Sequence, residues 1–170
     1  MIRALAAAAL LVLAACGGAE VTTRGGTAQL RPDANGLAIA DNPLRIDFGR
    51  AQEGVLTAVT RVLGAPPANS VTNSECGAGP LQIVQYAEIT LLFQNGNFVG
   101  WTTDDPRISL ANGLSAGVTR AQLENGGYGP FRPTTLGVEF EADGIFGLLP
   151  DNDAATPIDT LWAGTTCFFR

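Results

Sequence analysis

The chain has 170 residues and carries 16 acidic side chains against 10 basic ones, none of them lysine, which gives a net charge of −6. It contains no histidine, so a Ser-His-Asp or Cys-His catalytic system cannot be assembled within it. An acidic chain without a basic cluster argues against nucleic acid as a partner, because such binding relies on cations against phosphate. We therefore expect no catalytic residue of these kinds, no metal site and no cofactor.

The first sixteen residues have the three parts of an export signal. Arg3 gives a positive start, residues 4–13 are apolar, and Leu13-Ala14-Ala15-Cys16 closes the segment. The apolar run is shorter than the about 20 residues that cross a bilayer as a helix. The closing box resembles the signal of bacterial lipoproteins. The resemblance implies a signal peptide over residues 1–15 and a lipid such as palmitate on Cys16.

A lipid on Cys16 implies that the chain is anchored to the membrane of a bacterial cell envelope and faces the periplasm. Acyl chains give stable anchoring because each buried CH₂ contributes about 0.8 kcal/mol. Gly17 rather than aspartate follows the cysteine, and the resemblance to lipoprotein sorting in enterobacteria implies transfer to the outer membrane. The alternative is an ordinary signal peptide with a cysteine there by chance.

Residues 16–41 are rich in Gly, Ala and Thr and show no apolar periodicity. We interpret them as a flexible tether, with an N-terminal strand over residues 36–46 as the alternative. The remaining residues, 42–170, have the length of a single domain.

The first half of this domain alternates between strand and helix patterns. Residues 42–48 predict a short strand, and apolar residues at helical spacing predict a helix over residues 53–64. A long link holding Cys76 follows. Strands are then expected over residues 81–86, 87–93 and 97–102, the last two around the tight turn Asn95-Gly96.

The second half repeats this order. Residues 114–124 predict a helix, with Thr119 and Gln122 at the spacing of a capping box. Alternating residues from 135 to 141 and the run from 145 to 149 predict a hairpin around Asp143-Gly144. Residues 158–169 predict a closing strand.

These halves read as two helix–hairpin repeats, over residues 44–103 and 114–149. They predict an α+β fold with helices packed on one face of an antiparallel sheet. The unit resembles outer-membrane-assembly lipoproteins of the SmpA/OmlA type and the tandem repeat of β-lactamase-inhibitor-like proteins, within an uncharacterised bacterial lipoprotein family. The resemblance implies a non-catalytic binding or scaffolding role. The alternative is chance similarity of two α-then-β segments.

Two cysteines remain after Cys16. Because an exported compartment is oxidising, Cys76 and Cys167 predict one disulfide. Its loop of about 90 residues is worth about 4.6 kcal/mol in the chain-entropy model. Two free thiols or two metal ligands are the alternatives.

Three side chains are candidates for a binding surface. Glu139 and Glu141 share a strand face and would form an acidic patch for a basic partner, or simply a solvated face. Trp101 would anchor recognition at a rim, or belong to the core. The aspartates at 104–105 and 151–153 predict turns rather than a Ca²⁺ site.

The expected function is a lipid-anchored binding or scaffolding module with an envelope protein as partner. Two alternatives stay open. One is a carboxylate-dependent hydrolase of cell-wall or glycan material, which needs two buried carboxylates in a cleft. The other is a small-ligand carrier, which needs a sizeable apolar cavity between sheet and helices.

Overall fold

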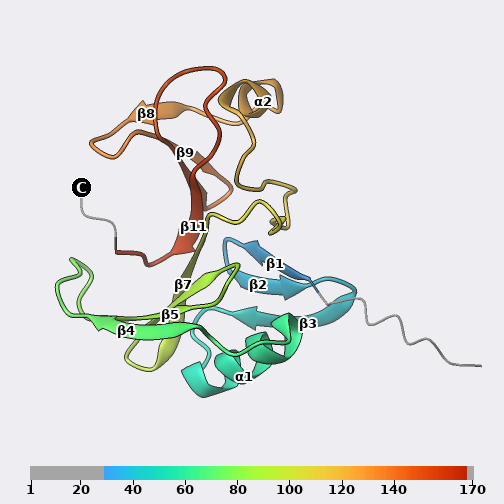
Figure 1. Cartoon of the computed structure of the whole chain (residues 1–170), viewed down its shortest axis with the longest axis vertical. Helices are drawn as coiled ribbons and strands as arrows, with labels where there is room; N and C mark the ends of the chain where they lie inside the picture. Colours follow the sequence, from blue (N-terminus) through green and yellow to red (C-terminus); the bar gives the residue numbers. More distant parts are fainter. Residues whose placement is uncertain (1–28, 168–170) are drawn as a thin grey trace, which may run out of the picture.

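The computed structural model describes residues 29–167, which form eleven strands and two helices. One antiparallel sheet has the order β1-β2-β3, and a second has the order β4-β5-β6-β7-β11-β10-β9-β8 (Figure 1). The small sheet comprises β1 (Leu30–Asp33), β2 (Gly36–Ile39) and β3 (Asn42–Asp47). The large sheet comprises β4 (Asn69–Asn73), β5 (Leu81–Gln85), β6 (Thr90–Gln94), β7 (Asn97–Thr103), β8 (Phe131–Pro133), β9 (Val138–Ala142), β10 (Ile145–Leu149) and β11 (Thr160–Gly164). The helices are α1 (Gln52–Leu63) and α2 (Arg120–Asn125).

The fold is mostly β, so the predicted α+β class, with helices covering one face of a sheet, is wrong. Helix α2 has only six residues, because the segment before it forms turns, with Gly117 at φ 86°. Residues 69–73, which fall in the predicted link, and residues 131–133, for which no element was predicted, are edge strands. Two helices of this size cannot cover an eight-stranded sheet, and the small sheet packs against it as well.

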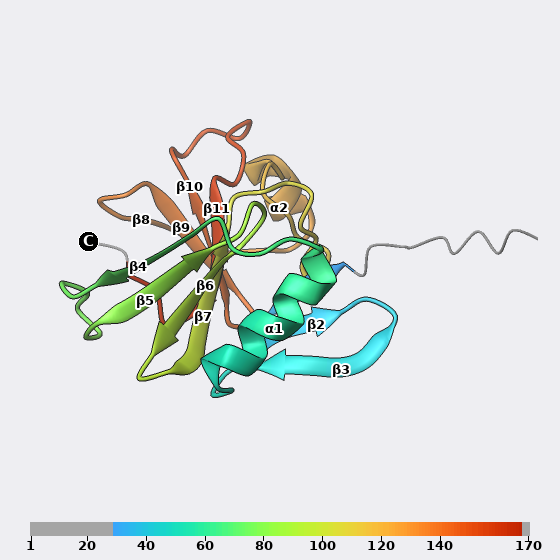
Figure 2. The same ribbon diagram turned by 60° about the horizontal axis from the view of Figure 1, so that its bottom comes forward.

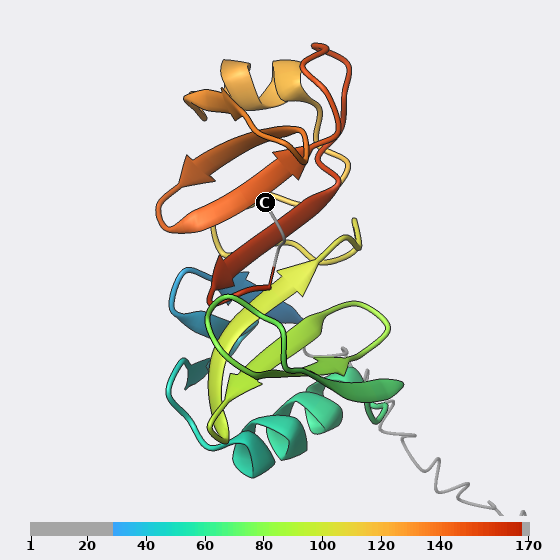
Figure 3. The ribbon, with the colours of Figure 1, turned by 90° about the vertical axis from the view of Figure 1, so that its left-hand side faces the viewer.

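The large sheet consists of two four-stranded meanders, seen one above the other in Figure 3. They meet where β7 pairs with β11, with Trp101 opposite Ala163. The predicted tight turns are confirmed: Asn95-Gly96 joins β6 to β7, and Asp143-Gly144 joins β9 to β10. Each half is therefore a helix followed by four strands, which is longer than the predicted helix–hairpin unit.

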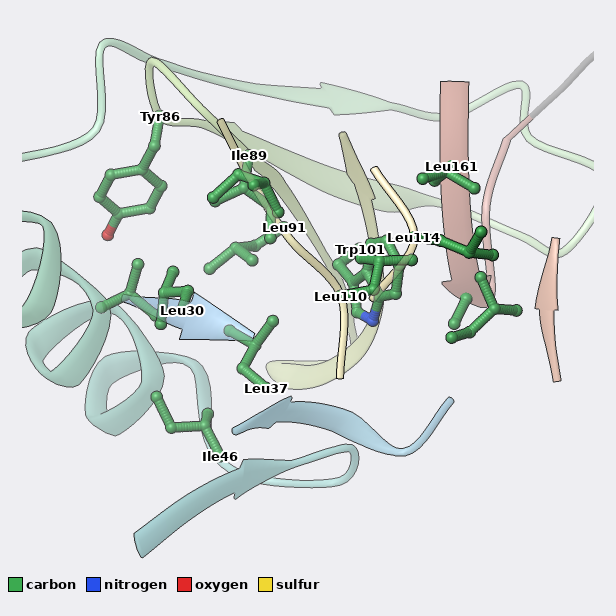
Figure 4. Packing of buried hydrophobic residues seen from close by; sticks show 14 of the residues in the cluster. Leu30, Leu37, Ile46, Tyr86, Ile89, Leu91, Trp101, Leu110, Leu114 and Leu161 are labelled. Atoms are coloured by element: carbon green, nitrogen blue, oxygen red, sulfur yellow. The ribbon is translucent and has the colours of Figure 1, made fainter. Parts of the chain in front are cut away.

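The small sheet corrects the predicted tether. Strands β1 and β2 lie within residues 30–39, where Leu30 and Leu37 are buried in the main core. Figure 4 shows these two side chains and Ile46 facing Tyr86, Ile89 and Leu91, which belong to the β5–β6 hairpin of the large sheet. The core therefore lies between the two sheets. The expected tether is folded from Leu30 onward, and Cys16 lies outside the described residues.

Helix α1 confirms the predicted helix over residues 53–64. Val55 and Val59 are buried on its inner side, and Gly64 ends it in the left-handed conformation at φ 72°. Its N–H donates to the carbonyl oxygen of Thr60 at 2.9 Å. Figure 2 shows α1 running beside β3 of the small sheet. Within residues 29–167, no helix has the length and apolar character needed to span a bilayer.

Candidate functional site

The two glutamates predicted to share a strand face do so on β9. Val138 and Phe140, which alternate with them, are buried in the core, while Glu139 is half-buried and Glu141 is exposed. Two residues of antiparallel strand separate their Cα atoms by about 6.8 Å. The alternation predicted from the sequence is therefore present, and both carboxylates lie on the face of the sheet away from the core.

These carboxylates line a groove of about 390 Å³, which we call the acidic groove. Its other acidic residue is Asp143 in the β9–β10 turn, and its basic residue is Arg132 on β8. The full lining is Pro130, Arg132, Pro133, Thr134, Glu139, Phe140, Glu141, Asp143 and Phe146. Three carboxylates against one guanidinium give this groove a negative potential at neutral pH.

Strand pairing fixes the arrangement of the groove. Arg132 of β8 lies opposite Glu139 of β9, and Phe146 of β10 lies opposite Glu141. The Phe146 ring stacks on Trp162 of β11, with centroids 5.8 Å apart and planes 17° apart. The groove thus combines carboxylates with a supported aromatic ring. Arginine guanidinium groups bind both of these, through bidentate hydrogen bonds and stacking.

The same geometry bears on the hydrolase alternative. Glycoside hydrolysis by two carboxylates needs one of them held protonated by burial. Among residues 29–167, the polar residues that are buried as a whole are Thr103 and Thr156, whereas Glu139 is half-buried with its Oε1 shielded from solvent and Glu141 is exposed. The described residues therefore lack the buried pair that this alternative requires.

Trp101 does not belong to a binding surface. Its side chain is fully buried, and its indole Nε1 donates a hydrogen bond to the carbonyl oxygen of Asp33 at 2.8 Å. The rim position expected from the sequence is wrong because β1, predicted as tether, covers this part of β7. Trp162 is also buried, but on the other face of the large sheet, where its ring stacks on Phe146.

The structure brings Cys76 and Cys167 together as free thiols. The Cys76 thiol donates to the carbonyl oxygen of Thr166 at 3.8 Å, and the Asn73 amide donates to the Cys167 sulfur at 3.5 Å. A hydrogen bond with Cys76, followed by burial, raises the pKa of Cys167 to about 11. This proximity is what a disulfide needs, and the bond itself stays a prediction.

The two aspartate clusters serve turns. Asp105 accepts a hydrogen bond from the Arg107 backbone N–H at 2.8 Å and pairs with its guanidinium, which lowers the pKa of Asp105. Asp151 accepts from the Asp153 N–H at 2.8 Å and from the Thr156 hydroxyl, which lowers its pKa. Within the described range, no group of three or more acidic or cysteine side chains is placed to hold a metal ion.

Sequence reasoning missed Arg132 and Phe146 as groove residues. Strand β8 is three residues long and contains a proline, so no pattern marked it. Phe146 stands between buried Ile145 and buried Gly147, and this alternation would have placed it on the outer face with Glu141.

Neither a family model nor a curated protein matches the chain. Among solved structures, the chain is similar to the uncharacterized protein yfeY from Escherichia coli, at 14% identity and a TM-score of 0.49. The match covers 81% of this chain and 99% of that one. At this score the similarity assigns no function. The lipoprotein families named from the sequence motifs remain a proposal.

Proposed function

We propose that this chain is a lipid-anchored protein of the bacterial cell envelope that acts as a non-catalytic binding or scaffolding module. The lipid on Cys16 is its anchor. Its cellular location is the periplasmic side of a membrane, with the outer membrane favoured. The sequence of residues 1–16 supports the anchor and the address. The acidic groove supports the binding role.

The partner that fits the acidic groove is an envelope protein that presents an arginine-rich segment. Glu139, Glu141 and Asp143 supply carboxylates, and Phe146 supplies a ring on which a guanidinium can stack. Exposed carboxylates act mainly on the rate of encounter, so this association should weaken as salt is added. The observation that carries the binding role is the concentration of three acids around one aromatic ring.

The anchor is tested by metabolic labelling with alkyne-palmitate in a bacterial host. Wild-type protein should take up label and sediment with membranes, and Cys16→Ala should do neither. An unlabelled wild-type protein would remove the anchor and the address together.

The groove is tested with a fluorescein-labelled nona-arginine peptide by fluorescence anisotropy. Glu139→Gln with Glu141→Gln should weaken binding about fivefold or more at low salt. The matched control is Glu53→Gln with Glu75→Gln, which removes the same charge from exposed sites outside the groove. Equal losses in the two double variants would reduce the effect to net charge and refute the groove as the docking site.

A further inference from the structure

A second groove lies between α1 and β3, at the end of the molecule opposite β8 (Figures 1 and 3). Its volume is about 760 Å³, within the range of small-molecule pockets, about 300–1,000 Å³. We call it the helix groove. Its apolar lining comes from α1, β3 and the end of β2 and includes Ile39, Pro43, Leu44, Ile46, Val55 and Val62.

Leu44 marks the helix groove as an unusual surface. Its side chain is 69% exposed, more than the other exposed large apolar residues, Val71 at 47% and Leu136 at 39%. It stands on β3, an edge strand of the small sheet, on the same side as the groove. Leu44 shares the groove with exposed Pro43 and with half-buried Ile39 and Val62, and a contiguous apolar surface of this kind is typical of a ligand-binding groove.

Gly54 keeps the helix groove open. It lies in the first turn of α1, where glycine is a poor helix former, and it lines the groove. A Cβ atom at this position would meet nothing within 4 Å, so no packing constraint requires a glycine there. A larger side chain at this lining position would take up part of the open space of the groove.

The charge of the helix groove is opposite to that of the chain. Arg45, Arg50 and Arg61 line it, against Asp47 as its acidic residue. Arg45 is already paired, at 2.8 Å with Asp33 and 2.9 Å with Asp47. Arg50 and Arg61 make no ion pair with any residue in the range 29–167, so both guanidinium groups can serve an anion.

We propose that the helix groove binds a single-chain amphiphile with an anionic head group. The apolar chain lies along the groove between α1 and β3, against Leu44 and Val62. The head group is held by Arg50, before the first turn of α1, or by Arg61 in its last turn. This site is independent of the acidic groove and of the lipid on Cys16.

The probe is laurate, added below its micelle-forming concentration to the full chain carrying Cys16→Ser. Binding is followed by calorimetry and by the backbone amide resonances of Gly54 and Ala58, which line the helix groove. We expect saturable binding at one site, with a dissociation constant of about 100 µM or tighter. Dodecanol, which has the same chain length but no charge, should bind about tenfold more weakly.

Two sets of variants separate the groove from nonspecific adsorption. Gly54→Leu fills the groove and should weaken laurate binding about tenfold or more, whereas Gly77→Leu is a matched control because a Cβ there also meets nothing within 4 Å. Arg50→Gln with Arg61→Gln should weaken it about fivefold, and Arg132→Gln should not. Arg50 and Arg61 are exposed, so replacing them should leave the fold intact. This double variant therefore tests the site even if Gly54→Leu unfolds the protein.

Three results would overturn the proposal. One is the absence of saturable laurate binding. Another is equal binding by Gly54→Leu and Gly77→Leu, with both variants folded by circular dichroism. The third is binding to anionic vesicles without binding to monomeric laurate, which would make this face a membrane contact. None of these results bears on the acidic groove or on palmitate labelling, so the two proposals fail separately.

Discussion

The indole N–H of Trp101 donates a 2.8 Å hydrogen bond to the backbone carbonyl oxygen of Asp33, across 68 residues of sequence. Trp101 stands on β7 at the middle of the large sheet, next to β11 of the second half. Asp33 ends β1 of the small sheet. This single bond therefore joins the small sheet to the seam between the two meanders.

Replacing Trp101 by phenylalanine should destabilise the protein by about 2–4 kcal/mol. The change removes this donor from the partly buried Asp33 carbonyl and removes apolar volume from the core. Urea unfolding measures the total loss of stability. Substitution by benzothienylalanine, which keeps the shape but has sulfur in place of the N–H, should cost about 1–3 kcal/mol. Hydrogen exchange should rise first in β1 and β2. If protection from hydrogen exchange were lost evenly over both sheets, the result would contradict a link between Trp101 and the small sheet.

The local elements with strong chemical signals could be predicted from the sequence. Asn95-Gly96 and Asp143-Gly144 adopt positive φ at both positions, which is what a two-residue hairpin turn requires. The helix over residues 52–63 follows from apolar spacing and the stop at Gly64. These features depend on a few neighbouring residues, so the chain's local chemistry decides them.

The fold class could not be predicted because it depends on weak strands. β4 has the sequence Asn-Ser-Val-Thr-Asn with four of its five residues exposed, and β8 has three residues including Pro133. β1 and β2 are four residues each, within a segment whose composition is typical of a tether. Such strands form because tertiary pairing satisfies their backbone groups, and composition does not report that pairing.

The candidate site was predicted in part. The alternation on β9 correctly placed Glu139 and Glu141 on one outer face, since a period of two belongs to the strand itself. The positions of Arg132 and Phe146 beside them depend on the register of β8 and β10. The helix groove depends on how α1 lies against β3, which the sequence leaves open.

Replacing each of two glycines by alanine should change the stability of the protein in opposite directions. Gly54→Ala should stabilise the protein by about 0.4–1 kcal/mol, because alanine favours the helix and the new Cβ meets nothing within 4 Å. Gly100→Ala should destabilise it by about 1–3 kcal/mol, because its Cβ would lie 2.2 Å from the Thr165 carbonyl oxygen. Urea midpoints measure both. A destabilised Gly54→Ala would contradict the open space at α1.

Thr119→Ala should cost about 1 kcal/mol. The Thr119 hydroxyl accepts from the Gln122 backbone N–H at 3.3 Å, and the Gln122 side chain accepts from the Thr119 N–H at 2.9 Å. The control is Thr119→Ser, which keeps the hydroxyl and should retain most of the stability. Thermal unfolding followed by circular dichroism compares the three proteins, and equal midpoints for all of them would show that the box contributes nothing.

Protein secreted into an oxidising compartment should carry a Cys76–Cys167 disulfide. Peptide mapping without reductant should return the linked pair, and reduction should lower the free energy of unfolding by at most about 4.6 kcal/mol. The double variant Cys76→Ser with Cys167→Ser gives the matched reduced state. Two thiols that alkylate in denaturant without reductant would refute the bond.

The reduced protein should lose stability in alkali. The contact with Cys76, and then burial, raise the pKa of Cys167 from 9.0 to about 11 in the folded protein. Between these values the unfolded chain releases its proton while the folded chain keeps it, so the folded state binds more protons and stability falls as pH rises. Below pH 9 both states are protonated and no dependence arises from this group.

Urea midpoints across this range should therefore fall for reduced wild type and fall less for Cys167→Ser, which has no thiol at this position. The oxidised protein should resemble the serine variant, because a disulfide does not titrate. Iodoacetamide should modify Cys167 of the reduced folded protein more slowly than an unfolded thiol at neutral pH, since the thiolate is the nucleophile. Identical pH profiles for wild type and Cys167→Ser would show that the two thiols do not interact in the folded protein.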